Sequence, residues 1–238
     1  MLKLTPRLQA MAELIPPGSI VADIGTDHAY LPVYLVLNKI SRWVVAVDLN
    51  QAPLQQAKET VVAFNCLQEV DLRLGNGLHA IKEADKIDTV VIAGLGGKSI
   101  AAILRDGRHL LKGVQQLILQ PMSEEGDLRL FLARNGFALA HETLAREGRR
   151  IYEIILAKAG QEQETDLFRL SFGPRLLEQK PPLLSVFLEE KIRKLKIIYH
   201  CLQRAKKDDV SLKLQEVERE IYCLEEVLTD VAAGTDLD

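Results

Sequence analysis

The sequence predicts an α/β protein with a seven-stranded, mostly parallel sheet, followed by a C-terminal coiled-coil hairpin of two helices. Three observations support this prediction. Short apolar runs alternate with helical patterns over residues 19–134, two strand-like segments follow at residues 137–157, and apolar side chains recur at helical spacing over residues 184–231. We therefore divide the chain into a first domain at residues 1–160, a connection at residues 161–182 and a helical hairpin at residues 183–238.

The composition is typical of a water-soluble globular protein, with 47% hydrophobic and 26% charged residues. We expect neither a membrane span nor a signal peptide, because no apolar run is long enough and the N-terminus lacks an apolar core. The three cysteines are too far apart for a zinc site, which favours reduced thiols in the cytoplasm and no bound metal. The net charge of −3 disfavours a general polyanion binder but permits a local basic surface.

A short amphipathic helix is predicted at residues 5–14, where leucine and methionine recur at helical spacing before a Pro-Pro-Gly stop. Two interpretations of this helix stay open. It covers an edge of the sheet, or it places Lys3 and Arg7 along the path of a bound nucleic acid.

The first strand, residues 19–24, runs into a turn with a single glycine, and a helix follows after Pro32. A dinucleotide site would require G-x-G-x-x-G at this turn, so a nicotinamide enzyme is disfavoured. Two acidic residues here would repel a pyrophosphate but attract a cation. S-adenosylmethionine carries a sulfonium and an ammonium group, and is therefore the expected cofactor. The residues expected to bind it are Asp23, Gly25, Thr26, Asp27 and His28.

The second strand, residues 43–48, ends in an acidic residue about twenty positions after the glycine turn. There a carboxylate can bind both hydroxyls of a ribose, and we assign this contact to Asp48, with Leu49 beside it. The alternative role of Asp48 is to cap the next helix. Asn50 can serve as that cap, which would leave Asp48 free.

The third strand, residues 70–74, ends in a turn formed by Gly75, Asn76 and Gly77. Two interpretations of this turn stay open, a contact with the adenine edge of the cofactor or an ordinary loop. The fourth strand, residues 86–93, is nearly all apolar and leads into a glycine-rich loop at residues 94–99. This loop lacks the P-loop spacing.

The fifth strand, residues 114–120, ends beside that loop, and Gln120 there has donor and acceptor groups for a base edge. A helix at residues 124–134 follows. Strands at residues 137–144 and 150–157, joined by a turn at residues 146–149, are then predicted to form an antiparallel hairpin at the far edge of the sheet. Five strands alternating with helices before a terminal hairpin are typical of Rossmann-like, class I methyltransferases that use S-adenosylmethionine.

The two C-terminal helices differ in charge. Residues 191–207 carry only basic charges, whereas the second helix is rich in glutamate, and residues 206–209 supply the turn between them. The opposite charges either form salt bridges across the hairpin or leave the first helix, with Lys191 and Lys194, to bind a phosphate backbone.

Taken together, these motifs resemble those of the bacterial tRNA adenine N1-methyltransferases that act on adenine 22, the TrmK family. The resemblance runs from Leu-Thr-Pro-Arg-Leu at residues 4–8 to the helical hairpin, and includes Asp-Ile-Gly-Thr-Asp-His at 23–28, Gly-Asn-Gly-Leu at 75–78 and Leu-Gln-Pro at 119–121. Asn76 stands where the family commonly has an acidic residue, and Leu95 where it commonly has methionine. The resemblance implies full-length tRNA as substrate and a coiled coil that helps to hold it.

On this basis we expect a ring nitrogen to be methylated, because the fourth strand lacks the [DNS]-P-P-[YFW] motif of amine methyltransferases. Alignment of the base is then the main task of the protein, and the base is flipped into the pocket. Asp27 or His28 would accept a proton from the methylated adenine, and Gln120 would lie beside the base. Tyr30 either stacks on a base or packs in the core, and we favour core packing. The full set expected to contact cofactor or substrate also includes Arg7, Gly75, Asn76, Gly77, Ala93, Gly94, Leu95, Gly96, Gly97, Gln120, Pro121, Lys191 and Lys194.

Other interpretations are a methyltransferase with an rRNA, protein or small-molecule acceptor, and an RNA-binding protein that has lost catalysis. The acidic residues of the cofactor loop count against lost catalysis. We expect a monomer.

Overall fold

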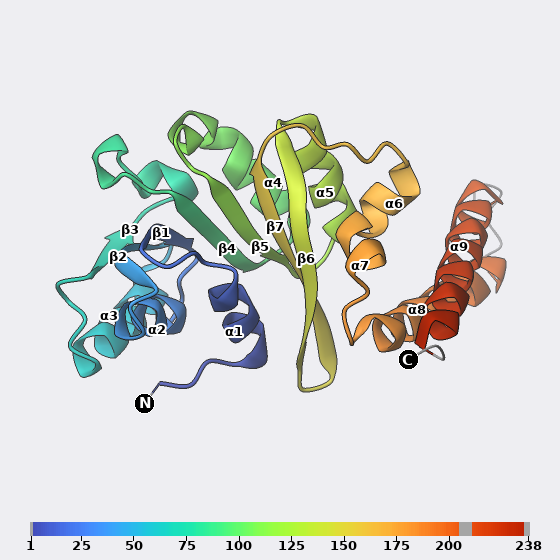
Figure 1. Cartoon of the computed structure of the whole chain (residues 1–238), viewed down its shortest axis with the longest axis horizontal. Coiled ribbons are helices and arrows are strands. Elements are labelled where there is room, and N and C mark those ends of the chain that lie inside the picture. Colours follow the sequence, from blue (N-terminus) through green and yellow to red (C-terminus); the bar gives the residue numbers. More distant parts are fainter. Residues whose placement is uncertain (1, 205–210, 236–238) are drawn as a thin grey trace. The chain divides into compact units, whose positions relative to one another are not determined.

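The computed structural model describes residues 2–204 and 211–235, with side chains up to residue 231. The chain forms two compact units, Met1–Leu176 and Leu177–Asp238 (Figure 1). The turn predicted at residues 206–209, together with Ala205, lies outside the described residues. None of the described helices combines the length and hydropathy that a bilayer span requires.

The first unit is built on a seven-stranded sheet with the strand order β3-β2-β1-β4-β5-β7-β6. The strands are β1 (Ser19–Ile24), β2 (Ser41–Asp48), β3 (Val70–Leu74), β4 (Thr89–Leu95), β5 (Gln116–Pro121), β6 (Phe137–Glu147) and β7 (Arg150–Ala159). β1 to β5 pair in parallel, whereas β7 is antiparallel to β5 and β6. The predicted sheet is confirmed. Its strand order reverses between β1 and β4, and sheets of this type bind ligands at that point.

Helices cover both faces of this sheet (Figure 1). They are α1 (Pro6–Glu13), α2 (Tyr30–Leu37), α3 (Gln51–Ala63), α4 (Gly97–Asp106), α5 (Glu125–Arg134), α6 (Leu167–Phe172) and the short segments η1 (Gly77–Ala80), η2 (Glu83–Asp85) and η3 (Arg108–Leu111). Successive side chains of a strand point to opposite faces. Accordingly, Val21 of β1 packs with α1 and α2, whereas Ala22 and Ile24 pack with α4 and α5.

Several strands differ from the predicted bounds. β2 begins at Ser41 rather than at residue 43, and β4 begins at Thr89 rather than at residue 86. β5 spans Gln116–Pro121 rather than residues 114–120, and β7 ends at Ala159 rather than at residue 157. β4 continues beyond the predicted end at residue 93, because Leu95 still pairs with Pro121 after a bulge at Gly94. The turn predicted at residues 146–149 is shorter in the structure. β6 extends to Glu147 and β7 begins at Arg150, so two residues make the turn.

Residues 161–182, predicted as a connection, contain α6 and a further helix, α7 (Pro174–Gln179). Leu170, Phe172 and Leu176 in this segment are buried. Burial of such side chains stabilises a fold by about 1.5–3 kcal/mol each, which gives this segment a reason to be ordered. The first unit therefore extends beyond residue 160.

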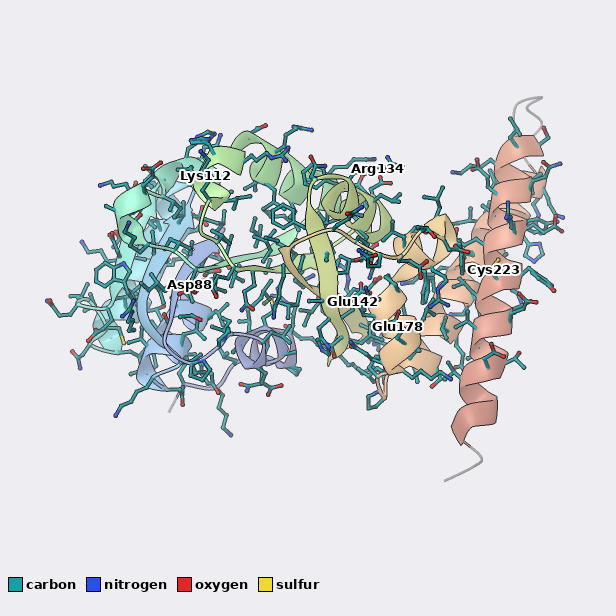
Figure 2. The ribbon with its side chains drawn as sticks, turned by 45° about the horizontal axis from the view of Figure 1, so that its top comes forward. Asp88, Lys112, Arg134, Glu142, Glu178 and Cys223 are labelled. Atoms are coloured by element: carbon teal, nitrogen blue, oxygen red, sulfur yellow. The ribbon has the colours of Figure 1, made fainter. Side chains whose placement is uncertain are left out.

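A buried ionic cluster joins α5 and α6 to the β6–β7 hairpin. The guanidinium of Arg129 is fully buried and donates hydrogen bonds to the carboxylates of Glu142 and Glu153 and to the carbonyl of Ser171. Glu142, labelled in Figure 2, also accepts the backbone N–H of Arg175 at 2.9 Å. Buried charges are tolerated only when they are paired and hydrogen-bonded, so this cluster fixes residues 171–175 against the sheet.

The second unit consists of α8 (Leu184–Arg204) and α9 (Ser211–Thr235), which pack against each other. The amine of Lys196 lies 2.7 Å from the carboxylate of Glu225, and the hydroxyl of Tyr199 donates to Glu218 at 3.2 Å. Because the residue numbers rise along α8 while they fall along α9, the helices are antiparallel, as predicted.

The buried stripe of α8 differs in part from the predicted spacing. Leu184 and Leu188 are buried as expected, but Ile192 continues the stripe at the next helical turn. Ile198, predicted to face inward, is 46% exposed.

Candidate active site

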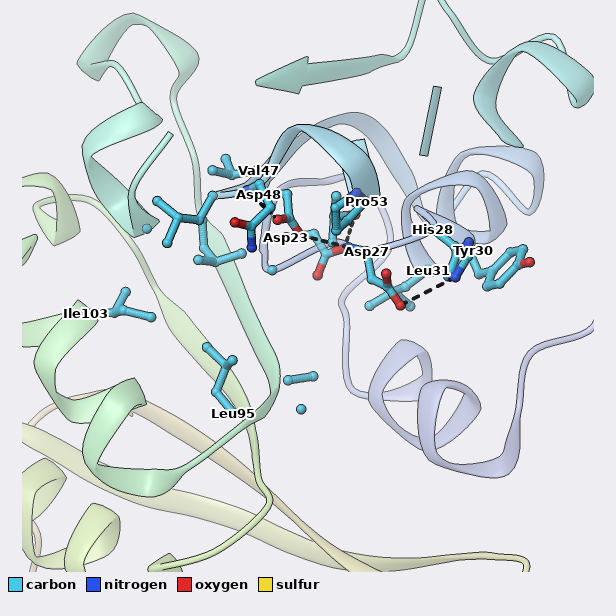
Figure 3. A pocket seen from close by; sticks show the side chains of 18 of the residues that line it. Asp23, Asp27, His28, Tyr30, Leu31, Val47, Asp48, Pro53, Leu95 and Ile103 are labelled. Atoms are coloured by element: carbon cyan, nitrogen blue, oxygen red, sulfur yellow. Dashed lines mark hydrogen bonds and ion pairs between the residues drawn. The ribbon is translucent and has the colours of Figure 1, made fainter. Parts of the chain in front are cut away.

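A cleft of about 570 Å³ opens at the carboxyl ends of β1, β2 and β4 (Figure 3). Its volume falls within the range of roughly 300–1,000 Å³ that is common for small-molecule and cofactor sites. α1 and the turn after β3 complete its walls. The predicted residues that line the cleft are Arg7, Asp23, Gly25, Thr26, Asp27, His28, Tyr30, Asp48, Leu49, Gly75, Asn76, Gly77, Ala93, Gly94 and Leu95.

The turn after β1 has an unusual backbone. Gly25 (φ +79°), Asp27 (φ +51°) and Ala29 (φ +55°) all adopt left-handed conformations. Such a conformation costs a non-glycine residue about 1–2 kcal/mol. The N–H groups of Gly25 and Thr26 both donate to the carbonyl of Val47, at 2.8 and 3.0 Å, and these bonds fix the turn to the end of β2.

Asp48 joins the loops around the cleft. Its Oδ1 accepts the N–H of Asn50 at 2.9 Å, its Oδ2 accepts the N–H of Asp27 at 3.3 Å, and its carbonyl accepts the N–H of Gly75 at 2.9 Å. Asn50 stands at the N-cap position of α3, as expected, although its side chain makes no capping bond. The expectation that Asp48 is left free is wrong, because its carboxylate accepts two backbone N–H groups. A carboxylate has about four acceptor positions, so Asp48 retains capacity for a ligand hydroxyl.

Asp23 is a buried acid of the site, only 5% exposed. Burial raises its pKa from the ordinary 3.8 to about 6. The hydroxyl of Thr26 donates to Asp23 at 2.7 Å and lowers this pKa, whereas the nearby Asp48 carboxylate raises it. The carboxyl of Asp23 therefore changes charge close to neutral pH.

Asp27, His28 and Tyr30 line the cleft with a carboxylate and two aromatic rings (Figure 3). His28 Nε2 lies 3.7 Å from Asp27 Oδ2. The His28 and Tyr30 rings are stacked, with centroids 5.3 Å apart and 14° between their planes. Tyr30 is 43% exposed, so the preference for core packing is wrong, and its ring is accessible for stacking on a base.

The turn at Gly75, Asn76 and Gly77 is shaped by close packing. A Cβ at Gly75 would lie 2.7 Å from the Cβ of Ala80, and one at Gly77 would lie 3.1 Å from the side chain of Ile103. Glycine at both positions therefore lets Asn76 approach the cleft, which supports the ligand-contact interpretation of this turn over the ordinary loop.

The glycine-rich segment at the end of β4 and the start of α4 serves two purposes. Ala93, Gly94 and Leu95 line the cleft, whereas Gly96 and Gly97 do not. A Cβ on Gly97 would overlap the backbone carbonyl of Glu124. Contrary to expectation, this glycine allows close packing of α4 rather than the approach of a substrate.

Gln120 lies behind the wall of the cleft rather than in it. Its side chain is fully buried, and its Oε1 accepts hydrogen bonds from Arg7 Nη1 at 2.7 Å and from the N–H of Gly94 at 3.2 Å. Its amide nitrogen donates to the Pro121 carbonyl at 2.7 Å. These bonds use its polar groups, so the structure corrects the predicted base contact of Gln120 to a positioning role. Pro121 is likewise buried outside the cleft lining.

Arg7 lies on the first helix, and the interpretation that this helix covers the sheet is confirmed. α1 packs on the sheet, and Arg7 also lines the cleft. Its guanidinium lies 5.4 Å from the ring centre of Tyr152, and its Nε lies 3.7 Å from Glu147.

Several residues that line the cleft were not predicted from the sequence to contact a ligand. They are Thr5, Leu8, Ile24, Leu31, Val47, Asn50, Pro53 and Ile103. Most of them adjoin a predicted residue, so extending each motif by one or two positions would have found them. Ile103 is different, because it reaches the cleft only through the packing of α4.

The charges of the cleft suit a cationic ligand. Three carboxylates, those of Asp23, Asp27 and Asp48, line it, and the positive charge of Arg7 lies beside Glu147. S-Adenosylmethionine, with its ribose and its two positive groups, fits this donor set. Within residues 2–204 and 211–235, no group of three or more His, Cys, Asp or Glu side chains is arranged to hold a metal ion.

The remaining predicted residues, Lys191 and Lys194, lie on α8 in the second unit. The amine of Lys191 is 5.7 Å from the ring centre of Phe187. Lys194 is exposed to solvent.

Comparison with known proteins agrees with this site. Residues 21–226 match the model of the TrmK family, described as tRNA (adenine(22)-N(1))-methyltransferase. The tRNA (adenine(22)-N(1))-methyltransferase of Bacillus subtilis (strain 168) is 35% identical over 95% of this chain and 98% of its own length.

Solved structures give the same result. TrmK of B. subtilis superposes with a TM-score of 0.87 at 33% identity, over 96% of this chain and 100% of that one. Streptococcus pneumoniae Sp1610 in complex with S-adenosyl-L-methionine superposes with a TM-score of 0.86 at 32% identity. The superposition covers 95% of this chain and 100% of that one. M. capricolum TrmK in complex with S-adenosyl-homocysteine superposes with a TM-score of 0.81 at 29% identity. The superposition covers 96% of this chain and 98% of that one.

Proposed function

Because the chain belongs to the family of tRNA (adenine(22)-N(1))-methyltransferases, we propose that it transfers a methyl group from S-adenosylmethionine to N1 of adenine 22 in tRNA. The observation that carries this proposal is the acidic cleft at the reversal point of the sheet, lined by Asp23, Asp27 and Asp48. A cleft with this charge binds a sulfonium better than a phosphate.

We assign the parts of the cofactor to residues of the cleft. Asp48 binds the ribose hydroxyls, since its carboxylate stands at the end of β2. Asp27, whose backbone N–H is held by Asp48, provides a negative charge for the cofactor's positive groups. Asn76 stands beside the adenine, with an amide where the family commonly has a carboxylate. When bound, S-adenosylmethionine supplies an electrophilic methyl group on a sulfonium sulfur.

The protein then acts chiefly by alignment. N1 of neutral adenine has a lone pair, so no residue needs to remove a proton before methylation. Gly94 and Leu95 form the wall of the cleft at the end of β4, and Gln120 holds this wall by accepting the N–H of Gly94. A rigid wall keeps the base in line with the methyl group, and orientation of this kind lowers a barrier by several kcal/mol.

The charge of the reaction also suits the site. Methylation at N1 moves a positive charge from sulfur onto the adenine ring, and the carboxylates of Asp23 and Asp27 stabilise positive charge throughout. His28, beside Asp27 at 3.7 Å, is placed to accept a proton from the methylated base. Tyr30 offers an exposed ring on which the flipped base stacks.

We assign tRNA binding in part to the basic face of α8. Lys196 is paired with Glu225 across the helical hairpin, which fits the salt-bridge interpretation for this residue. Arg193 and Lys194 are exposed. Replacing both by alanine should weaken tRNA binding and leave cofactor binding unchanged, whereas Lys213→Ala on α9 should alter neither. Equal tRNA affinities for the two variants would mean that the hairpin has a structural role only.

The remaining parts of the proposal concern the working state of the enzyme. We propose that it acts as a monomer in the cytoplasm, without a metal ion. The division into a methyltransferase domain and a tRNA-holding hairpin is part of the same proposal.

The decisive experiment measures methyl transfer from labelled S-adenosylmethionine to unmodified tRNA transcripts, followed by nucleoside analysis. We expect N1-methyladenosine, and its loss when adenine 22 is replaced. Methylation of another acceptor would contradict the proposed specificity. Cofactor binding without transfer to any RNA would support a binding protein that has lost catalysis.

A further inference from the structure

The turn between β6 and β7 is rich in arginine. Residues 146–150 read Arg-Glu-Gly-Arg-Arg, and Arg146, Arg149 and Arg150 are all exposed. We call these three residues the arginine turn. Glu147 is the single acid among them, and its carboxylate lies 3.7 Å from Arg7 Nε, so its charge is already offset by an arginine outside the turn.

The arginine turn projects beyond the edge of the sheet at which the cleft opens. β5 and β7 are antiparallel, with Leu119 opposite Ile155, so Pro121 at the end of β5 corresponds to residue 153. The turn at residues 148–149 therefore lies about 4–5 residues past the end of β5, which is roughly 15 Å at the rise of a strand. Figure 1 shows the hairpin extending past the other strands, near α1.

Arg7 connects this turn to the cleft. It lines the cleft, approaches Glu147, and lies over the ring of Tyr152 at 5.4 Å. Arg150 lies over the same ring at 5.1 Å and also donates to the carbonyl of Met122 in the segment after β5. These contacts hold the base of the turn against α1 and β5, so the arginine turn is fixed beside the cleft.

We infer that the arginine turn binds the tRNA backbone next to the nucleotide that enters the cleft, an inference that rests on the proposed function. A base that is flipped into a pocket needs its flanking phosphates held at the pocket mouth. Arginine binds phosphate with a planar pair of N–H donors. Three exposed arginines, with the adjacent acid already beside Arg7, provide such a surface in the first unit, separate from the basic face of α8.

Variants of Arg149 test this inference, because Arg149 is exposed in the turn itself. Arg149→Ala should weaken the binding of unmodified tRNA roughly five- to tenfold at 0.1 M salt, since one fewer phosphate contact releases about one counterion fewer. The slope of log affinity against log salt should become shallower by about 1. Arg149→Glu should weaken binding further, and Arg149→Lys should restore most of it.

Arg42→Ala is the matched control. Arg42 is also exposed, but it lies at the start of β2, at the opposite edge of the sheet from the cleft. We expect tRNA affinity, salt slope and methyl transfer of this variant to equal those of the parent. Cofactor affinity and the melting temperature, measured for every variant, show whether each fold is intact. Arg146→Ala provides a second variant of the turn.

The measurements distinguish failure of this inference from failure of the proposed function. Suppose that the parent protein binds and methylates tRNA, and that Arg149→Ala and Arg149→Glu equal it in tRNA affinity, KM and salt slope. This result would overturn the role of the arginine turn and leave the proposed function intact. A parent protein that binds no tRNA would overturn both. A raised KM for tRNA with an unchanged kcat at saturation is the expected result.

Discussion

Asp23 makes cofactor binding depend on pH in a way that the structure predicts in sign and size. Its carboxyl is 5% exposed, and its pKa is raised from 3.8 to about 6, first by burial and then by Asp48. A shift of about 2 units corresponds to roughly 3 kcal/mol between the charged and neutral forms. A cationic cofactor favours the charged form, so binding should weaken as Asp23 takes up a proton.

The expected magnitude follows from this pKa. If the cofactor binds only when Asp23 is ionised, its apparent Kd is nearly constant above pH 7 and about tenfold higher at pH 5. Titration calorimetry between pH 5 and 7.5 measures this change. In buffers of different ionisation heat at pH 5.5, binding should also release a proton. Asp23→Asn should bind more weakly at pH 7.5 and lose most of the pH dependence.

Protein stability provides an independent check with a known sign. A carboxyl whose pKa is raised by folding binds more protons in the folded state, so its contribution to stability falls as pH rises from about 4 to about 6. Without cofactor, Asp23→Asn should therefore be more stable than the parent at pH 7.5, by up to about 3 kcal/mol, and similar to it near pH 4. An unchanged Kd for the parent from pH 7.5 to 5 would refute the reasoning. A pH dependence retained in Asp23→Asn would assign the titration to another group.

Three further substitutions test separate parts of the structure. Asp48→Ala should weaken cofactor binding by roughly 10- to 150-fold in calorimetry, because charged hydrogen bonds contribute about 1.5–3 kcal/mol each. The control Asp106→Ala, at an exposed position, should leave cofactor affinity unchanged. Equal affinities for the two variants would contradict the ribose contact. Gln120→Leu leaves the N–H of Gly94 and the guanidinium of Arg7 without their acceptor, so it should lower the free energy of unfolding by about 1–3 kcal/mol and slow single-turnover transfer more than it weakens cofactor binding. A transfer rate equal to the parent's would rule out this positioning role. Arg129→Met should lower the free energy of unfolding in urea by about 3–5 kcal/mol, because it leaves two buried carboxylates unpaired. The half-exposed Arg169→Met should cost less than about 1 kcal/mol, and a similar loss for both would contradict the buried cluster.

The residues of the cofactor loops were predictable because the signal is local. An apolar run sets where a strand ends, and parallel strands bring their carboxyl ends to one edge of the sheet. This alone brings Asp23, Gly25 and Asp48 together, and the cleft confirms that they lie around one cavity. The fold follows from this periodicity and the turn residues, whereas the family resemblance rests on the motifs at these turns.

Only the tertiary structure decided which polar groups face the cleft and which support it. Gln120 lies at the end of a strand just as Asp48 does, yet it stands outside the cleft lining, where Arg7, 113 positions earlier in the chain, donates a hydrogen bond to its side chain. Arg129 lies on a helix where sequence spacing predicts nothing unusual, but two glutamates of β6 and β7 enclose it. Such contacts join residues far apart in the sequence and have no period along the chain. Side-chain environments of this kind are therefore set by packing, whereas strand ends and turns are set by local sequence.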